Sequence, residues 1–167
     1  HTSAGVARLR VACTEAGAEL APVGQNPVDA VWEDQPTAPL GPVMCLTATQ
    51  AGVSSGEKRR EFSRGLEEAQ CAASVLSAPD SIAWLLNIRG SDVPNTPLAL
   101  GYAVVYRSGD VDWSIDTRKI RDSIRQNLES GISIFPPTEF ADRLGLLGKS
   151  DGAVLVDPAS APEWIRL

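Results

Sequence analysis

Histidine is nearly absent from this sequence, because the only imidazole is that of His1 at the start of the chain. A chain end is the place least often held rigidly enough for chemistry. Zinc and paired-metal hydrolase sites recruit imidazole or thiolate together with carboxylates, and a serine hydrolase needs a histidine base. No G-x-G-x-x-G or G-x-x-x-x-G-K-[ST] loop for phosphate occurs either. The sequence therefore predicts no catalytic residue, no metal ligand and no cofactor in this chain.

Excess positive charge and long apolar runs are also missing. The formal net charge is −6 and the sequence pI about 4.8, so phosphate backbones and anionic bilayers exert no general attraction on the chain. No stretch approaches the roughly 18 apolar residues of a membrane span. We expect no nucleic-acid partner and no membrane partner. The one basic run, Lys58–Arg60, stands among glutamates and is typical of a solvated helix face.

Cysteine is scarce, and Cys13, Cys45 and Cys71 are odd in number and far apart. That arrangement suits neither a disulfide framework nor a zinc site made from close pairs. A nucleophilic cysteine would need a base, and the only imidazole is terminal. We therefore predict reduced thiols and a cytoplasmic location.

What the sequence does contain is an alternation of helical and strand-like segments. Apolar residues at helical spacing predict helices over 2–16, 26–32, 54–73, 80–86, 117–130, 136–147 and from 161 onward. Short apolar runs predict strands over 20–23, 74–77, 98–106, 111–115, 132–135 and 152–157. The two middle runs flank Arg-Ser-Gly-Asp and predict a hairpin. The alternation indicates an α/β domain with a mixed, partly parallel sheet flanked by helices.

The chain length fits one domain, or one domain with a short extension, since 167 residues can bury a core of their own. Residues 1–33 are expected to form a helix and a strand leading into the domain, plus a short helix. Three prolines in residues 34–43 fix φ and remove backbone donors, which predicts an extended connector. Residues 44–167 would form the main part of a single α/β domain. Because the chain begins at a helix cap without methionine and ends inside a newly capped helix, we expect a longer parent polypeptide.

The most unusual segment is an apolar helix that runs into an Arg-Gly-Ser-Asp loop. In a structural interpretation, Trp84 is core, Gly90 allows a left-handed turn, and Arg89 is held by a carboxylate such as Asp92. In a functional interpretation, Arg89 projects toward a ligand or a neighbouring domain and grips carboxylates or carbonyls. For the isolated domain we favour the structural interpretation.

Paired carboxylates are the last catalytic arrangement that the composition allows. Asp110 with Asp112, or Asp80 with Asp92, would supply such a pair. Turn and cap duties explain these residues better, because Asp80 stands at a predicted helix start and Asp110 in the predicted hairpin turn.

The apolar helix and the Arg-Gly-Ser-Asp loop lie in the segment DSIAWLLNIRGSDVPNTPL. This segment closely resembles the middle domain of three-domain Xaa-Pro aminopeptidases (aminopeptidase P, peptidase family M24). These enzymes belong to the creatinase and methionine aminopeptidase group. Three other segments are similar to that family: NPVDAVWEDQP, AGVSSGEKRREF and VLVDP. Pro27 stands where the family usually has leucine, which is compatible with a helix start. The resemblance covers essentially the whole chain.

The resemblance implies a creatinase N-terminal-like domain with a mixed, roughly six-stranded sheet. It implies a parent enzyme that removes the N-terminal residue preceding proline, with two divalent metal ions, usually manganese, in a C-terminal pita-bread domain. That catalytic domain is absent here, and no position of this sequence matches its metal ligands. By fold-level analogy, this domain would help control substrate access and packing between domains and subunits of a homodimeric parent. Arg89 and Asp92 are then the candidates for a substrate-facing or domain-facing surface.

Three hypotheses about function follow. The first is a non-catalytic accessory domain of a Xaa-Pro aminopeptidase, with adjacent domains as partners and proline-containing peptides as the parent's substrates. The second is a stand-alone creatinase-like module that binds a peptide or a protein. The third and weakest is an independent small hydrolase.

Overall fold

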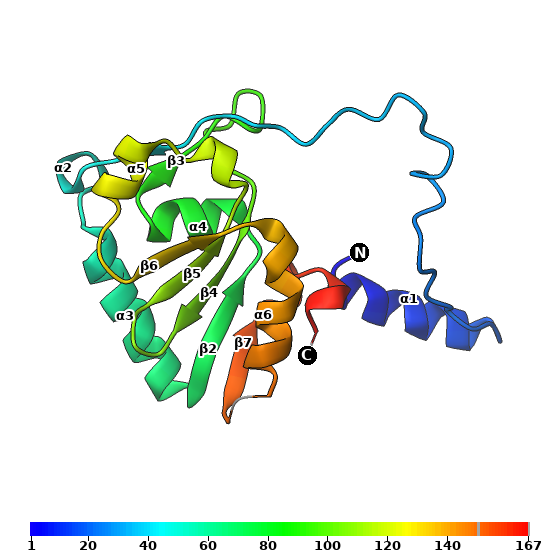
Figure 1. The fold of residues 1–167 in the computed structure, drawn as a ribbon. Helices are drawn as coiled ribbons and strands as arrows, with labels where there is room; N and C mark the ends of the chain where they lie inside the picture. The colour runs from blue at the N-terminus through cyan, green and yellow to red at the C-terminus, as the bar shows by residue number, and fades with distance from the viewer. Residues whose placement is uncertain (150, 167) are drawn as a thin grey trace.

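A five-stranded mixed sheet forms the centre of the computed structural model, which describes residues 1–149 and 151–166 (Figure 1). The strand order is β6-β5-β4-β2-β7, with bounds β2 Cys71–Leu76, β4 Tyr102–Tyr106, β5 Val111–Ser114, β6 Ile132–Phe135 and β7 Ala153–Val156. The two inner pairings, β2 with β4 and β4 with β5, are antiparallel, whereas both outer pairings are parallel. The predicted α/β class and mixed sheet are confirmed, with five strands in the main sheet.

A separate two-stranded ribbon stands beside the main sheet. Its strands are β1, Met44–Cys45, and β3, Ile88–Arg89, which pair antiparallel. The ribbon brings the end of the connector onto the segment that carries Arg89, so two regions far apart in sequence meet there.

Helices cover both faces of the sheet. The α-helices are α1 Ser3–Glu15, α2 Ala48–Ala51, α3 Ser55–Glu68, α4 Pro79–Leu85, α5 Asp122–Asn127 and α6 Phe140–Leu147, and 3-10 turns occupy Thr117–Lys119, Pro137–Glu139 and Glu163–Ile165. One core cluster joins α4, α5 and the Trp113 face of the sheet, with Phe62 of α3 packed against it. The other cluster lies on the opposite face, where Phe140 and Leu144 of α6 meet Ala73 and Val104.

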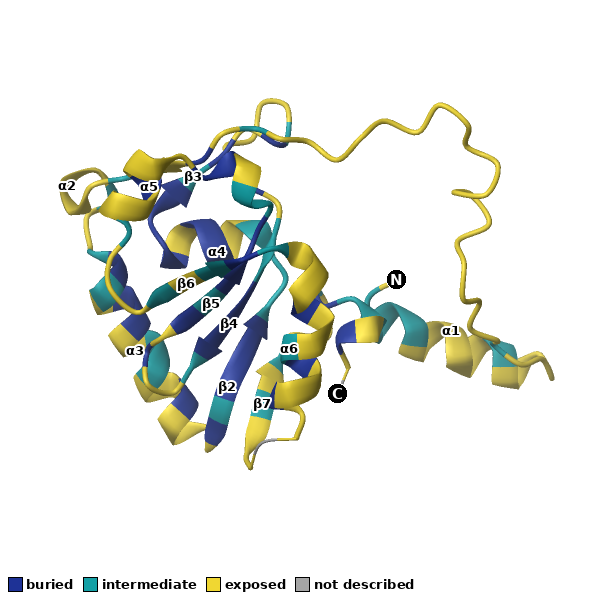
Figure 2. Cartoon of the chain, viewed as in Figure 1, coloured by how far each residue is buried: buried dark blue, intermediate teal, exposed yellow. Residues whose placement is uncertain are grey.

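Side-chain alternation along the strands explains these two cores. In β4, Ala103 and Val105 belong to the first cluster and Val104 to the second. Successive side chains of a strand point to opposite faces, so a strand covered on both sides reads as a continuous apolar run. The burial colours of Figure 2 follow this pattern, with the inner strands largely buried and the helices exposed on their outer sides.

Helix α3 begins at the capping box that its sequence predicts. The hydroxyl of Ser54 accepts from the backbone N–H of Glu57, whose carboxylate accepts in return from the Ser54 N–H. The Glu129 carboxylate satisfies two further free donors of this helix end, the N–H groups of Ser55 at 2.8 Å and Gly56 at 2.6 Å. The Glu129 side chain therefore connects the segment before β6 to the N-terminus of α3.

Replacing Glu129 with glutamine is expected to lower the free energy of unfolding by about 1 kcal/mol, because two donors at a helix N-terminus lose a charged acceptor. The matched control is Glu68→Gln at the other end of the same helix, where the exposed carboxylate caps no N-terminal donor. Urea denaturation of both variants measures the difference. Equal stability of the two variants would contradict this role.

Several predicted segments differ from the structure. The helix expected over 117–130 is split into a 3-10 turn and α5, and Asp116, not a residue of α5, caps the turn. The last segment forms only a 3-10 turn after Pro162, instead of a helix capped by Ser160. Helix α4 starts one residue earlier than expected, with Ala78 as N-cap, since Pro79 fills its first position. Asp80 lies in its first turn.

The basic run of α3 is not the solvated face that its glutamate neighbours predict. Lys58 and Arg59 are both buried, and only Arg60 is exposed. The Arg59 guanidinium donates to the carbonyls of Gly109 and Ser130, each at 2.8 Å. Long basic side chains can lie along apolar surface and place their charged ends on backbone carbonyls. The glutamates near Lys58 and Arg59 in the sequence therefore did not indicate that these two side chains are buried.

Residues 16–42, here called the arm, contain no helix or strand and are exposed almost throughout (Figures 1 and 2). The strand predicted over 20–23 is not formed. The short helix predicted over 26–32 is reduced to hydrogen-bonded turns, in which the N–H groups of Ala30 and Trp32 donate to the carbonyls of Asn26 and Val28. Val23 is 70% exposed and Val31 78%. The predicted strand has no partner strand among the described residues, which is why its apolar pattern alone produces no regular structure.

Candidate functional site

The loop that follows β3 is organised around Asp92. The Asp92 carboxylate accepts from the Lys119 ammonium at 2.6 Å and from the backbone N–H groups of Gly41 at 3.0 Å and Leu100 at 2.7 Å. The Asp92 side chain is 0% exposed and that of Lys119 is 5% exposed. One buried ion pair thus joins the connector, the segment before β4 and the 3-10 turn at Thr117–Lys119.

Close backbone packing surrounds this ion pair. A Cβ at Gly41 would lie 2.6 Å from the carbonyl carbon of Ser91, and a Cβ at Gly90 would lie 2.7 Å from the backbone of Ala99. Only glycine permits such approaches. Gly90 is therefore needed for close packing, and its φ is not in the left-handed region that the structural interpretation assigned to it.

Arg89 lies next to this loop but does not contact Asp92. Its guanidinium donates to the carbonyls of Ile88 at 2.7 Å and Ala83 at 3.4 Å. The predicted pairing of Arg89 with Asp92 is wrong, because Lys119 takes that carboxylate. Arg89 is half-buried, has no carboxylate partner among the described residues, and keeps part of its surface in contact with solvent.

A second cation is buried near Arg89. The Lys58 ammonium donates to the Trp84 carbonyl at 2.9 Å and to the Asn87 side-chain oxygen at 2.6 Å, and lies 4.8 Å from the Trp84 ring centroid. Burial lowers the pKa of Lys58, and the charge of Arg89 lowers it further. The Trp84 side chain lies on the surface and is 54% exposed. The expectation that it belongs to the core is wrong, because α4 turns this position away from the sheet.

The carboxylates that might have formed a catalytic pair have separate structural partners. Asp110 accepts from the Ser108 hydroxyl within the hairpin turn, as predicted. Asp112, in β5, accepts from the Tyr106 hydroxyl and from Arg143, each at 3.0 Å. Asp92 and Asp80 share no hydrogen bond, since Asp80 accepts from the Ser81 N–H at the start of α4. None of these carboxylates faces a second carboxylate as an acid–base pair.

Tyr106 is expected to titrate near pH 12. Burial, with the Asp112 charge and hydrogen bond, raises the pKa of Tyr106 from its ordinary 10 to about 12. The folded state then holds the proton more tightly than the unfolded state, so this stabilisation is complete below pH 10 and is lost as the pH rises toward 12. Tyrosinate absorbance of the native chain, minus that of Tyr106→Phe, measures the value. A difference titrating at the ordinary pH would contradict the network.

The described residues, 1–149 and 151–166, contain no group of three or more His, Cys, Asp or Glu side chains that could hold a metal ion. All three cysteines are free thiols, and burial raises the pKa of Cys45. No helix in these ranges is long and apolar enough to cross a membrane.

Residues 52–56 match the G-x-S-x-G pattern of serine nucleophiles, but they are not a nucleophile elbow. Ser54 is the N-cap of α3, and its hydroxyl donates to Glu57. A nucleophilic serine needs a neighbouring histidine base, and the only imidazole belongs to exposed His1. The pattern here is a capping box.

The creatinase/prolidase N-terminal domain family matches residues 34–167. The chain belongs to this family. It is 38% identical over 125 residues to a protein of Sordaria macrospora named probable Xaa-Pro aminopeptidase P, with 74% of this chain and 20% of that protein aligned. It is 32% identical over 162 residues to a protein of the same name from Paracoccidioides brasiliensis, with 96% of this chain and 26% of that protein aligned.

The fold of this creatinase-type domain is also found in a larger solved enzyme. The crystal structure of X-prolyl aminopeptidase from Caenorhabditis elegans, described as a cytosolic enzyme with a di-nuclear active site, superimposes with a TM-score of 0.87 at 28% identity. The match covers 98% of this chain and 27% of that chain. This chain therefore spans between 20% and 27% of the length of these relatives.

Proposed function

We propose that this chain is a non-catalytic accessory domain, the middle one of three, of a metal-dependent Xaa-Pro aminopeptidase. The observation that carries the proposal is that nearly the whole chain is similar to about a quarter of the length of an aminopeptidase P. In addition, the described residues contain no cluster of side chains that could hold a metal ion. The reaction would be removal of the N-terminal residue preceding proline. Its two divalent metal ions, of which manganese is our expectation, would lie in another domain of the parent.

The structure offers this domain a role in shape and packing. Gly41, Asp92 and Lys119 fix the end of the connector against the loop that follows β3. We propose that this fixed loop and the half-buried Arg89 face the substrate path or a neighbouring domain. Asp92 has no exposed oxygen to offer a partner, so its part in the proposal is to position the loop.

We also propose how the chain is divided within a longer polypeptide. We propose that residues 1–33 lead into the domain, that residues 34–43 are the connector, and that residues 44–167 form the main part of the domain. The proposed partners are adjacent domains of the parent, a second parent subunit, and proline-containing peptides bound at the parent active site. We propose a cytoplasmic location, because the Caenorhabditis elegans relative is described as a cytosolic enzyme.

Titration of the purified chain with Xaa-Pro peptides, followed by calorimetry, separates this proposal from a stand-alone peptide-binding module. An accessory domain without the catalytic domain is expected to give no saturable heat, because most of the substrate contacts would belong to the parent active site. Saturable binding that is lost in Arg89→Ala would favour the stand-alone module. The matched control is Arg60→Ala, which removes an exposed arginine from α3.

A further inference from the structure

Trp84 lies on the outer side of α4, away from the sheet. More than half of its side chain is exposed, whereas Ile82 and Leu85 of the same helix are buried in the first core cluster. A single exposed apolar side chain is ordinary in a folded protein. Trp84 differs from such a residue, because the grooves and charges around its ring are those of a contact surface.

Two grooves flank the Trp84 ring. One has a volume of about 470 Å³ and is formed by α3, β2 and α4, with Phe62 and Leu85 in its lining. The other has a volume of about 510 Å³ and includes Ala51 and the half-exposed Val53. The indole lines both grooves, so an apolar surface that covers it can also fill the space on either side. Trp84, Val53 and the two grooves are called the Trp84 surface below.

The Trp84 ring is held in place by a buried lysine. The Lys58 ammonium lies 4.8 Å from the ring centroid and donates to the Trp84 carbonyl and to the Asn87 side chain. The Asn87 amide donates in turn to the Val53 carbonyl at 2.8 Å. This network fixes the exposed ring relative to Val53 and α3. A side chain that is ordered before binding loses less entropy on association, which favours fixed aromatic residues as interface anchors.

Positive charge near the Trp84 surface lacks carboxylate partners. Lys58, Arg60 and Arg89 form no salt bridge within residues 1–149 and 151–166. The glutamates that line the second groove are engaged, Glu57 in the capping box and Glu61 in a salt bridge of α3. Of the three cations, Arg60 is the exposed one. A partner that covers this surface is therefore expected to bring a carboxylate to Arg60.

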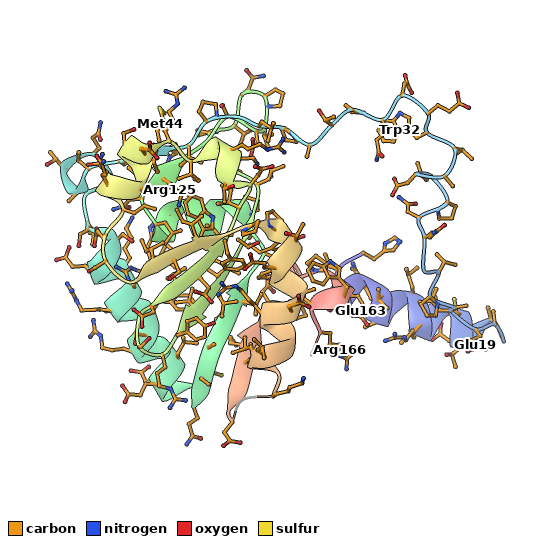
Figure 3. All side chains as sticks on the ribbon, in the orientation of Figure 1. Glu19, Trp32, Met44, Arg125, Glu163 and Arg166 are labelled. Atoms are coloured by element: carbon orange, nitrogen blue, oxygen red, sulfur yellow. The ribbon has the colours of Figure 1, made fainter. Side chains whose placement is uncertain are left out.

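The segment that leads into the domain packs on the other side of the molecule. Helix α1 is held beside β7 by hydrogen bonds such as that from the Ser3 N–H to the Ala161 carbonyl at 3.0 Å. Figure 1 shows α1 and α3 on opposite sides of the molecule. Figure 3 shows the same separation between Glu163, beside α1, and Met44, which pairs with Arg89 in the two-stranded ribbon. In the proposed parent, the preceding domain would therefore lie on the α1 side.

The length of the relatives supplies an occupant for the Trp84 surface. This chain matches between 20% and 27% of their length, so most of the parent surface belongs to other domains. Domains of one chain meet through interfaces of roughly 600–1,500 Å². Because the preceding domain would lie on the α1 side, the catalytic domain is the part of the parent that is left to cover Trp84.

We propose that Trp84 anchors this domain on the catalytic domain of the parent. The indole enters an apolar pocket of that domain, Val53 lies at the edge of the contact, and a carboxylate of the catalytic domain pairs with Arg60. Lys58 holds the ring in the position that this contact needs. The identity of the partner rests on the proposed function, and the proposal adds the surface through which the accessory domain is held.

Photo-crosslinking of the longer polypeptide tests the contact directly. The photoreactive amino acid p-benzoylphenylalanine replaces Trp84, and the same replacement of Leu146 is the control, because that exposed side chain belongs to α6 on the opposite face of the sheet. Irradiation is expected to join position 84 to a residue beyond position 167 of the same polypeptide. The absence of this product, the same product from position 146, or a crosslink to the preceding domain or to a second copy would overturn the proposal.

Oxidation by hydroxyl radicals tests the same contact with unmodified proteins. Trp84 is expected to react several-fold more slowly in the longer polypeptide than in this chain, whereas the fully buried Trp113 should react slowly in both. Equal rates for Trp84 would overturn the contact. Hydrolysis of an Xaa-Pro peptide by the same longer polypeptide tests the proposed function separately. Protection of Trp84 without hydrolysis would refute that function and support the contact, and hydrolysis with Trp84 unprotected would refute the contact alone.

Discussion

Replacing Asp92 with alanine is expected to lower the free energy of unfolding by about 3–5 kcal/mol, because it leaves the buried Lys119 ammonium without its partner. The carboxylate also accepts from the N–H groups of Gly41 and Leu100, which would lose their acceptor. Urea denaturation measures the loss. The connector should also become more sensitive to protease, because Gly41 is held through this carboxylate.

Two variants make this prediction specific. Glu61→Ala is the control: its carboxylate pairs with Arg64 on the surface of α3, where the two side chains are 68% and 69% exposed, so its loss should be much smaller. The double variant Asp92→Leu with Lys119→Met should be more stable than either single change implies, since it leaves no unpaired buried charge. A loss of stability in Asp92→Ala that is no greater than that in Glu61→Ala would contradict this role of the buried ion pair.

Replacing Phe140 with alanine is expected to cost about 3–5 kcal/mol, the range for a buried aromatic ring that leaves a cavity. The Phe140 ring stacks on Tyr102 at 4.8 Å and contacts Phe135 and Trp164 at 6.3 and 5.9 Å between centroids. Its loss would detach the start of α6 from the second core cluster. Thermal unfolding followed by circular dichroism measures the effect.

Leu146 of the same helix provides the control, because its side chain is 68% exposed. Leu146→Ala removes apolar atoms from α6 without opening a cavity, so a change within about 0.5 kcal/mol is expected. A similar cost for both substitutions would mean that α6 is held by its helical propensity and not by the Phe140 ring.

Local signals in the sequence were sufficient for most of the fold. The capping box at Ser54 and Glu57, the hairpin around Arg107–Asp110 and the paired prolines before Phe140 each depend on neighbours a few residues apart. Such patterns can be read without knowing the tertiary structure. They predicted the start of α3, the pairing of β4 with β5 and the presence of α6. The helix predicted over 54–73 was too long, because α3 ends at Glu68 and β2 already begins at Cys71, and α6 begins at Phe140 after a 3-10 turn instead of at residue 136.

The organisation of the candidate site could not be predicted in the same way. Asp92 meets Lys119 across 27 positions and Gly41 across 51, and Lys58 meets Asn87 across 29. No local pattern distinguishes these partners from other charged residues. Arg89 was assigned to the nearest carboxylate in sequence, whereas the fold placed that carboxylate on a lysine from another segment.

The arm shows the opposite error, a local pattern without a tertiary partner. Residues 20–23 have the composition of a strand, but a strand needs a neighbour to satisfy its backbone groups. The described chain supplies none. The predicted helix over 26–32 likewise buries no apolar face, because Val28, Val31 and Trp32 are all exposed.

The most direct test of the proposed function compares hydrolysis of an Xaa-Pro peptide by two purified proteins in the presence of Mn²⁺. One is this 167-residue chain, and the other is the longer polypeptide that we expect the same gene to encode. The account predicts no hydrolysis by the short chain, and metal-dependent release of the residue preceding proline by the long one. Metal-dependent cleavage by the short chain alone, or none by the long polypeptide, would contradict it.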